Sequence, residues 1–165
     1  MTKEQLPSLI GKLLLIVLVV VLLISSMVYL NKRWSRIRDI RRQADAKAVV
    51  RALQLYYNQY DEFPDSLDDD GFGWDKSNDL ADRSFLKPLV TFGLLNGEPF
   101  DPENDADFYY RYQKFPAGSF GCQYPFVVFQ VMQFETNGFE AGQGQCEDID
   151  FTALAPYGYT WQEFE

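Results

Sequence analysis

The sequence predicts an α+β protein in which a long N-terminal helix packs its second half on a small antiparallel β-sheet. Proline is absent between Ser8 and Phe63, and Gly11 is the only glycine there, so little in this stretch would break a helix. Apolar residues recur with helical spacing up to Tyr60, whereas short runs rich in aromatic residues and valine follow Phe100. One long helix before one small sheet accommodates both patterns.

The first half of this helix is apolar throughout. No charged residue lies between Lys12 and Lys32, and the run Leu13–Leu30 approaches the roughly 20 residues that a helix needs to cross a bilayer. A cleaved signal peptide is the alternative, but its apolar core is usually about 7–15 residues long and is followed by a small-residue cleavage site. The sequence has a longer run and no such site. We therefore expect a short tail over residues 1–12 and a retained transmembrane helix over residues 13–30, with the lipid bilayer as a partner.

Basic residues crowd the chain directly after the apolar run. They are Lys32, Arg33, Arg36, Arg38, Arg41, Arg42, Lys47 and Arg51. Residues 31–62 are therefore predicted to form a basic neck and an amphipathic continuation of the helix, and such a neck is attracted to anionic lipid headgroups. The rest of the chain is acidic and the formal net charge is −9, so nucleic acid is not an expected partner. Counted by the positive-inside rule alone, the same basic residues would place the C-terminal domain in the cytoplasm.

The second half of the helix has an amphipathic pattern. Its apolar stripe consists of Val49, Ala52, Leu53, Tyr56 and Tyr60, and its remaining faces carry Arg41, Arg42, Asp45, Lys47 and Arg51. The stripe predicts packing on a soluble core, and a helix from about Leu9 to Tyr60 would be about 78 Å long. Phe63-Pro64 stops it, since helical geometry is disfavoured in the residue before a proline.

A small α+β globular domain is expected over residues 63–165. The acidic stretch Asp65–Asp79 is predicted to be a loop. Leu80–Leu95 is predicted to be a short helix with Asp79 as a candidate N-cap, and Pro88 must either lie in its first turn or interrupt it.

Three later segments have the composition of β-strands. Phe108–Tyr112 is a short aromatic run, Pro125–Phe134 is the strongest strand signal, and Tyr157–Phe164 is predicted to be an edge strand. Turns are expected at Pro116–Ser119 and at Asn137-Gly138. These segments would form the antiparallel sheet.

Cys122 and Cys146 are the only cysteines of the chain. A single pair in a small domain outside the cytoplasm usually forms a disulfide, and two separate buried thiols are the alternative. A domain facing the cytoplasm would instead carry free thiols. We favour the disulfide and an extracytoplasmic domain, against the positive-inside count.

The sequence predicts no enzyme. It has no histidine, which excludes imidazole general bases and histidine-ligated metals. It also lacks the nucleophile-elbow, P-loop and zinc-protease motifs.

Calcium is the one cofactor that the residues suggest. Glu147, Asp148 and Asp150 place three carboxylates close together in the sequence, and calcium prefers oxygen ligands. The alternative is a charged edge that discourages sheet pairing. The loop that begins with Ser66–Gly71 is a weaker candidate, because Ser77 stands where an EF-hand loop has its final glutamate.

The order of these motifs resembles type IV pilins and the major pseudopilins of type II secretion systems. The resemblance rests on the charged passage Arg42–Lys47, the helix end Ala52–Tyr57, the stop Glu62-Phe63-Pro64, the passages Gly93–Leu95, Pro99–Asn104 and Tyr109–Tyr112, and the strand Tyr124–Phe129. It implies a pilin-like fold, anchored in a bacterial cytoplasmic membrane, that acts in a structural or assembly role with other pilin-like subunits or with secretion and pilus assembly proteins. Major pseudopilins bind calcium near the C-terminal end of the domain, where Glu147, Asp148 and Asp150 lie in this chain.

The chain departs from this family pattern at its N-terminus. Prepilins carry a glycine followed by Phe or Met, and an acidic residue early in the apolar run that is thought to neutralise the N-terminal amine of a neighbouring subunit. Here Lys12 follows Gly11, and no acidic residue lies between Glu4 and Asp39. The departure favours a second hypothesis, a membrane-tethered extracytoplasmic binding or sensor module with no filament role.

Overall fold

The computed structural model describes residues 5–67, 73–79 and 84–165. The chain divides into two units, Met1–Ile37 and Arg38–Glu165, and helix α1 (Gln5–Tyr60) contributes to both. The second unit adds a five-stranded sheet and short helices, which confirms the predicted α+β class.

Helix α1 ends at Tyr60, as predicted, but it begins at Gln5, within the expected tail. Pro7 is tolerated there because it lies in the first turn, where an N–H would have no partner inside the helix. Asp61, with a φ of 60°, turns the chain out of the helix. Within the described residues, α1 is the one helix long and apolar enough to cross a membrane, and its apolar stretch is exposed to solvent.

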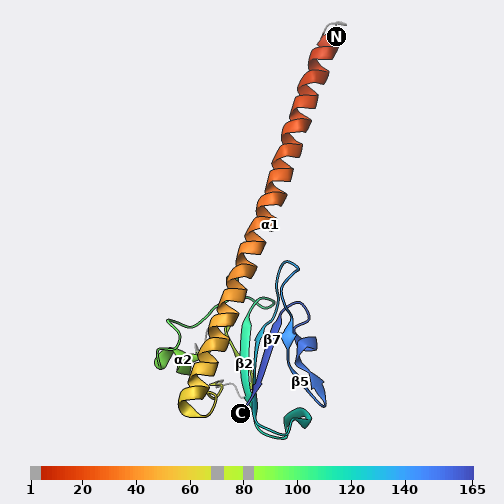
Figure 1. Cartoon of the computed structure of the whole chain (residues 1–165). Helices are drawn as coiled ribbons and strands as arrows, with labels where there is room; N and C mark the ends of the chain where they lie inside the picture. The colour runs from red at the N-terminus through yellow and green to blue at the C-terminus, as the bar shows by residue number, and fades with distance from the viewer. Residues whose placement is uncertain (1–4, 68–72, 80–83) are drawn as a thin grey trace. The chain divides into compact units, whose positions relative to one another are not determined.

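The main sheet has the strand order β1-β2-β3-β7-β4. Figure 1 shows β2 and β7 beside the second half of α1. The strands of the sheet are β1 (Asp75–Lys76), β2 (Tyr110–Phe115), β3 (Phe126–Val131), β7 (Tyr159–Phe164) and β4 (Gly142–Gln143). The first four are antiparallel, whereas β4 pairs parallel to β7, so the expectation of a purely antiparallel sheet was wrong. Nor is β7 the edge strand that was expected, because it lies between β3 and β4.

Strand β3 is buried along its whole length because both faces of the sheet are covered. On one face, Val127, Phe129 and Val131 join the core that contains Val49 and Leu53 of α1. On the other face lies a second cluster, composed of Phe115, Cys122, Phe126, Val128, Cys146 and Phe151. The continuous Val- and Phe-rich run therefore reflects a strand between two cores.

The helix expected over Leu80–Leu95 is reduced to α2 (Lys87–Thr91) within the described residues, since residues 80–83 lie outside them. Leu86 precedes it with a φ of 51°, which interrupts helical geometry, and Pro88 lies in the first turn, which is one of the two expected placements. Asp79 is therefore not its N-cap. Gly93, with a φ of 70°, follows its end.

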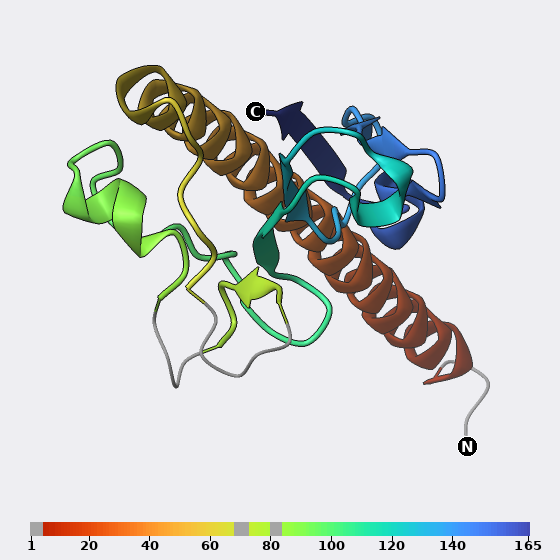
Figure 2. The ribbon, with the colours of Figure 1, turned by 90° about the horizontal axis from the view of Figure 1, so that it is seen from below.

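The remaining elements lie beside the second cluster. They are the 3-10 helices η1 (Ser119–Gly121) and η2 (Phe151–Leu154) and the small antiparallel pair β5 (Gln145–Cys146) and β6 (Ile149–Asp150). Figure 2 shows α2 and β7 on opposite flanks of the second half of α1.

Candidate functional site

A buried ionic cluster joins the second half of α1 to two loops of the domain. The side chain of Arg42 is fully buried, and its Nε and Nη2 donate hydrogen bonds of 2.7 and 2.9 Å to the carboxylate of Asp101. Its Nη1 donates to Asp39 at 2.8 Å and to Glu135 at 2.7 Å. The guanidinium also lies 4.6 Å from the centre of the Phe108 ring.

The acidic partners of Arg42 are themselves held by backbone groups. Asp39 accepts hydrogen bonds from the N–H groups of Glu135 at 2.9 Å and Thr136 at 2.8 Å, and Asp101 accepts one from Glu103 at 2.9 Å. Burial would lower the pKa of Arg42, but its hydrogen bonds to the three carboxylates outweigh burial and raise the pKa. The cluster is closed to solvent at Arg42, so its role is to fasten the loops to α1.

The prediction that Arg42 lies on an outer face of α1 was wrong. Asp39, Arg42 and Ala46 extend the buried stripe of Val49 and Leu53 toward the N-terminus, with spacings of three and four residues. This spacing was the signal in the sequence that could have predicted the burial of Arg42. It was overlooked because charged side chains are usually exposed. Asp45 was also expected on an outer face, yet it is half-buried and accepts a hydrogen bond of 3.0 Å from the Tyr110 hydroxyl; burial raises the pKa of Asp45.

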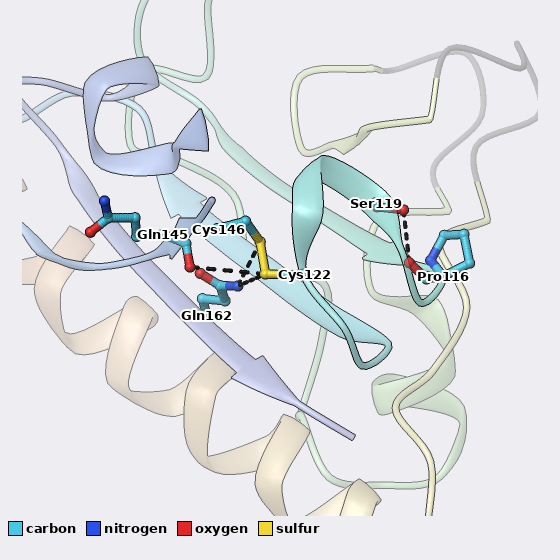
Figure 3. The surroundings of a disulfide bond; sticks show 6 residues. All are labelled: Pro116, Ser119, Cys122, Gln145, Cys146 and Gln162. Atoms are coloured by element: carbon cyan, nitrogen blue, oxygen red, sulfur yellow. Dashed lines mark hydrogen bonds between the residues drawn. A yellow bond between two sulfur atoms is a disulfide. The ribbon is translucent and has the colours of Figure 1, made fainter. Parts of the chain in front are cut away.

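A disulfide joins Cys122 to Cys146 in the second cluster (Figure 3). It links the connection between β2 and β3 to strand β5, across 24 positions of sequence. The Gln162 side chain on β7 donates its amide N–H groups toward both sulfurs, at 3.7 Å from Cys122 and 3.5 Å from Cys146. The bond therefore ties the β5–β6 pair to the main sheet.

The structure does not gather the carboxylates proposed to bind calcium. Asp150 accepts hydrogen bonds from the N–H and hydroxyl of Thr152, at 2.9 and 2.6 Å, and these bonds lower the pKa of Asp150. Glu147 and Asp148 both lie beside Gly121, where an added Cβ would be 2.7 Å from the Cβ of Glu147 and 3.3 Å from Oδ2 of Asp148. Among the described residues, no group of three or more acidic or cysteine side chains is placed to hold a metal ion. Calcium at Glu147, Asp148 and Asp150 thus stays a prediction from sequence.

The weaker calcium candidate cannot be placed in the same way. Asp68, Asp69, Asp70 and Gly71 of the loop beginning at Ser66 lie outside the described residues. Within that loop, the described residues Asp75 and Lys76 form strand β1 instead of irregular backbone.

Some basic side chains of the neck pair with carboxylates once the domain is folded. Arg42 is buried, Arg38 pairs with Glu135 and with Glu103, and Arg41 lies 3.7 Å from Asp45. Lys32 and Arg33 remain exposed, next to Trp34, whose exposed fraction is 58%. Arg38, Arg41 and Arg42 are therefore paired with carboxylates once the domain is folded.

No protein-family model, curated protein or solved structure matches the chain.

Proposed function

We propose that the protein is a single-pass membrane protein that presents an α+β domain outside the bacterial cytoplasm and acts there as a pilin- or pseudopilin-like structural or assembly component. One observation carries the proposal. The same helix, α1, supplies the exposed apolar run Leu13–Leu30 and the buried stripe through Val49 and Leu53. Exposed leucine, isoleucine and valine in such a number are favourable in lipid and unfavourable in water.

The disulfide supports the extracytoplasmic orientation. Disulfides persist in oxidising compartments and are rare in the cytoplasm, where thiols are kept reduced. The motifs that resemble pilins and pseudopilins support the assembly role.

A second candidate is a membrane-tethered binding or sensor module without a filament role. It is favoured by the absence of an acidic residue between Glu4 and Asp39. A subunit without that charge lacks the partner for an amine buried in a filament core.

The orientation is tested by protease accessibility in a bacterial host. We expect the domain to be digested in intact spheroplasts and protected in inverted membrane vesicles, and the protein to resist extraction by alkaline carbonate. Protection in spheroplasts would overturn the orientation, and extraction by carbonate would overturn the anchor.

The assembly role is tested separately, by site-specific crosslinking from exposed positions of the domain in cells that carry a type II secretion or pilus system. Crosslinks to pilin-like subunits or to the assembly platform are expected. Their absence, in a protein that is inserted and oxidised, would favour the binding or sensor module.

A further inference from the structure

A groove of about 500 Å³ runs along the second half of α1. It is lined by Lys47, Ala48, Arg51, Ala52, Leu55, Leu94, Leu95 and Asn96. Five of these eight residues are apolar and none is acidic. The groove lies between α1 and the segment that follows α2.

The floor of the groove can accept the side chains of a partner helix. Ala48 and Ala52 are small, so they allow a close approach to the α1 backbone. Leu55 has an exposed fraction of 46%, although leucine is usually buried. From Lys47 to Leu55 the groove follows α1 for about 12 Å, or two helical turns. This matches the spacing of apolar anchors in helix-in-groove recognition.

The rim of the groove carries two cations, and one of them, Lys47, also lines a neighbouring pocket with Glu140. Lys47 and Arg51 are exposed, lie one turn apart on α1, and have no carboxylate within ion-pair distance among the described residues. Like charges at this spacing destabilise a helix. They also stand out in their setting, because residues 38–165 contain 23 Asp and Glu against 10 Lys and Arg. A local basic rim on an acidic domain favours acidic partners and disfavours others.

We infer that this groove binds an amphipathic helix of another protein, one whose apolar stripe is flanked by carboxylates. The inference rests on the proposed function in one respect, that the domain acts through protein contacts, and it names the surface and the chemistry of the partner. A second copy of the chain does not fit the groove as well. Within the described residues, the second half of α1 buries its own stripe, and α2 has five residues, so neither offers a free acidic amphipathic helix.

The test uses the full chain in detergent micelles, where the groove is accessible whether or not the protein spans a bilayer. The probe is a fluorescein-labelled helical peptide of about five turns, with leucines in one stripe and glutamates on both flanks. A second probe carries lysines in place of the glutamates. Fluorescence anisotropy measures the Kd of each.

We expect the glutamate peptide to bind and the double variant K47E/R51E to weaken it at least about tenfold, in line with the loss of two close charge pairs. The same variant should now prefer the lysine peptide. The matched control K76E/K87E, with the same charge change outside the groove lining, should bind the glutamate peptide like the native chain.

Absence of binding, or an equal loss in K76E/K87E, would overturn the inference. So would self-association that requires Lys47 and Arg51, because a second copy would then occupy the groove. Near-UV circular dichroism verifies that each variant is folded. Bilayer insertion is measured separately by carbonate extraction. Release of the protein by carbonate would count against the proposed function, but it would not bear on the inference that the groove binds a helix.

Discussion

Arg42 and Asp101 form a bidentate ion pair across 59 positions of sequence, and both side chains are fully buried. A buried ion pair adds little stability compared with well-packed apolar residues of the same volume, but removal of one partner leaves an uncompensated charge in the interior. The pair therefore fixes how the loop at Asp101 sits on α1 more than it stabilises the fold.

Substitution of Arg42 should consequently be severe. In R42M the carboxylates of Asp39 and Asp101 lose their shared cation, and we expect the free energy of unfolding to fall by about 3–5 kcal/mol. Urea unfolding of the full chain, followed by near-UV circular dichroism, measures it. The control R41M removes a side chain that is 62% exposed and forms an ion pair with Asp45 at 3.7 Å, so its effect should stay within about 1 kcal/mol. Equal effects would contradict the role assigned to the cluster.

Loss of the disulfide should also destabilise the domain. A bond that closes a loop across 24 positions limits the unfolded chain, and the chain-entropy relation gives about 3.5 kcal/mol for this loop length. We expect C122A/C146A to unfold at lower urea concentration than the native protein, and the native protein with reductant to behave similarly. If reductant shifted the midpoint of C122A/C146A as well, the shift would have another origin.

Stability should decline steeply in alkaline solution. Burial raises the pKa of the Tyr110 and Tyr112 hydroxyls above 10.0, and Tyr112 also donates a hydrogen bond of 2.6 Å to the Pro64 carbonyl. Burial opposes the charge of Lys114, but Glu165 and Asp65 outweigh it and raise the pKa of Lys114 above 10.5. Each group holds its proton more tightly in the folded state. Its stabilising contribution is therefore complete below the unfolded pKa and is lost as the pH rises toward the folded one.

The tyrosinate absorbance on alkaline titration measures this decline. Two tyrosines should ionise only as the fold is lost, and Y112F should make the unfolding free energy less dependent on pH above about 10. Y157F removes a tyrosine that is 72% exposed and should leave the pH profile unchanged. Ionisation of all tyrosines in the folded protein would refute the assignment.

Anionic lipids should gather around the first unit of the chain. Lys32 and Arg33 are exposed directly after the apolar run, and Tyr29 and Trp34, with exposed fractions of 67% and 58%, flank them as aromatic residues do at a membrane interface. Each basic residue near an anionic surface contributes about 1 kcal/mol, so we expect phosphatidylglycerol to be selected over phosphatidylcholine by up to roughly fivefold at each of the two residues.

Electron spin resonance of spin-labelled lipids in proteoliposomes measures that selectivity. K32Q/R33Q should bring the ratio close to one, whereas K47Q/R51Q, with the same change of charge, should not. Motionally restricted lipid without selectivity would contradict the lipid preference alone. A spectrum without any restricted lipid would contradict membrane insertion itself.

The parts of the fold that the sequence predicts are those whose pattern is local. The end of α1 follows from Phe63-Pro64, and β3 follows from a run of Val and Phe long enough to be seen. Strands β1 and β4 have two residues each and carry no periodicity, so they could not be predicted. The shortened α2 depends on the left-handed φ of Leu86. This conformation is uncommon for residues other than glycine, so a leucine in the sequence does not predict it.

The candidate sites, like the fold, could be predicted only where the signal lies in the local sequence. The cysteine pair could be predicted because there are no other cysteines to choose from. The ionic cluster could not, because Asp101 and Glu135 reach Arg42 from loops far along the chain. Three neighbouring carboxylates suggested a metal site at Glu147–Asp150. In the structure Glu147 and Asp148 lie beside Gly121, whereas Asp150 accepts hydrogen bonds from Thr152, and calcium there stays a prediction from sequence.

The distance in sequence between Arg42 and Glu135 also sets an order of events during synthesis. Glu135 is made 93 residues after Arg42, which at about 5–20 residues per second takes roughly 5–20 seconds. Throughout that interval Arg42 stands beside the apolar run without the carboxylate of Glu135. The insertion machinery therefore meets the full basic neck, while the finished domain displays only part of it. In this protein the charge that orients the nascent chain and the charge that the mature surface offers are different quantities.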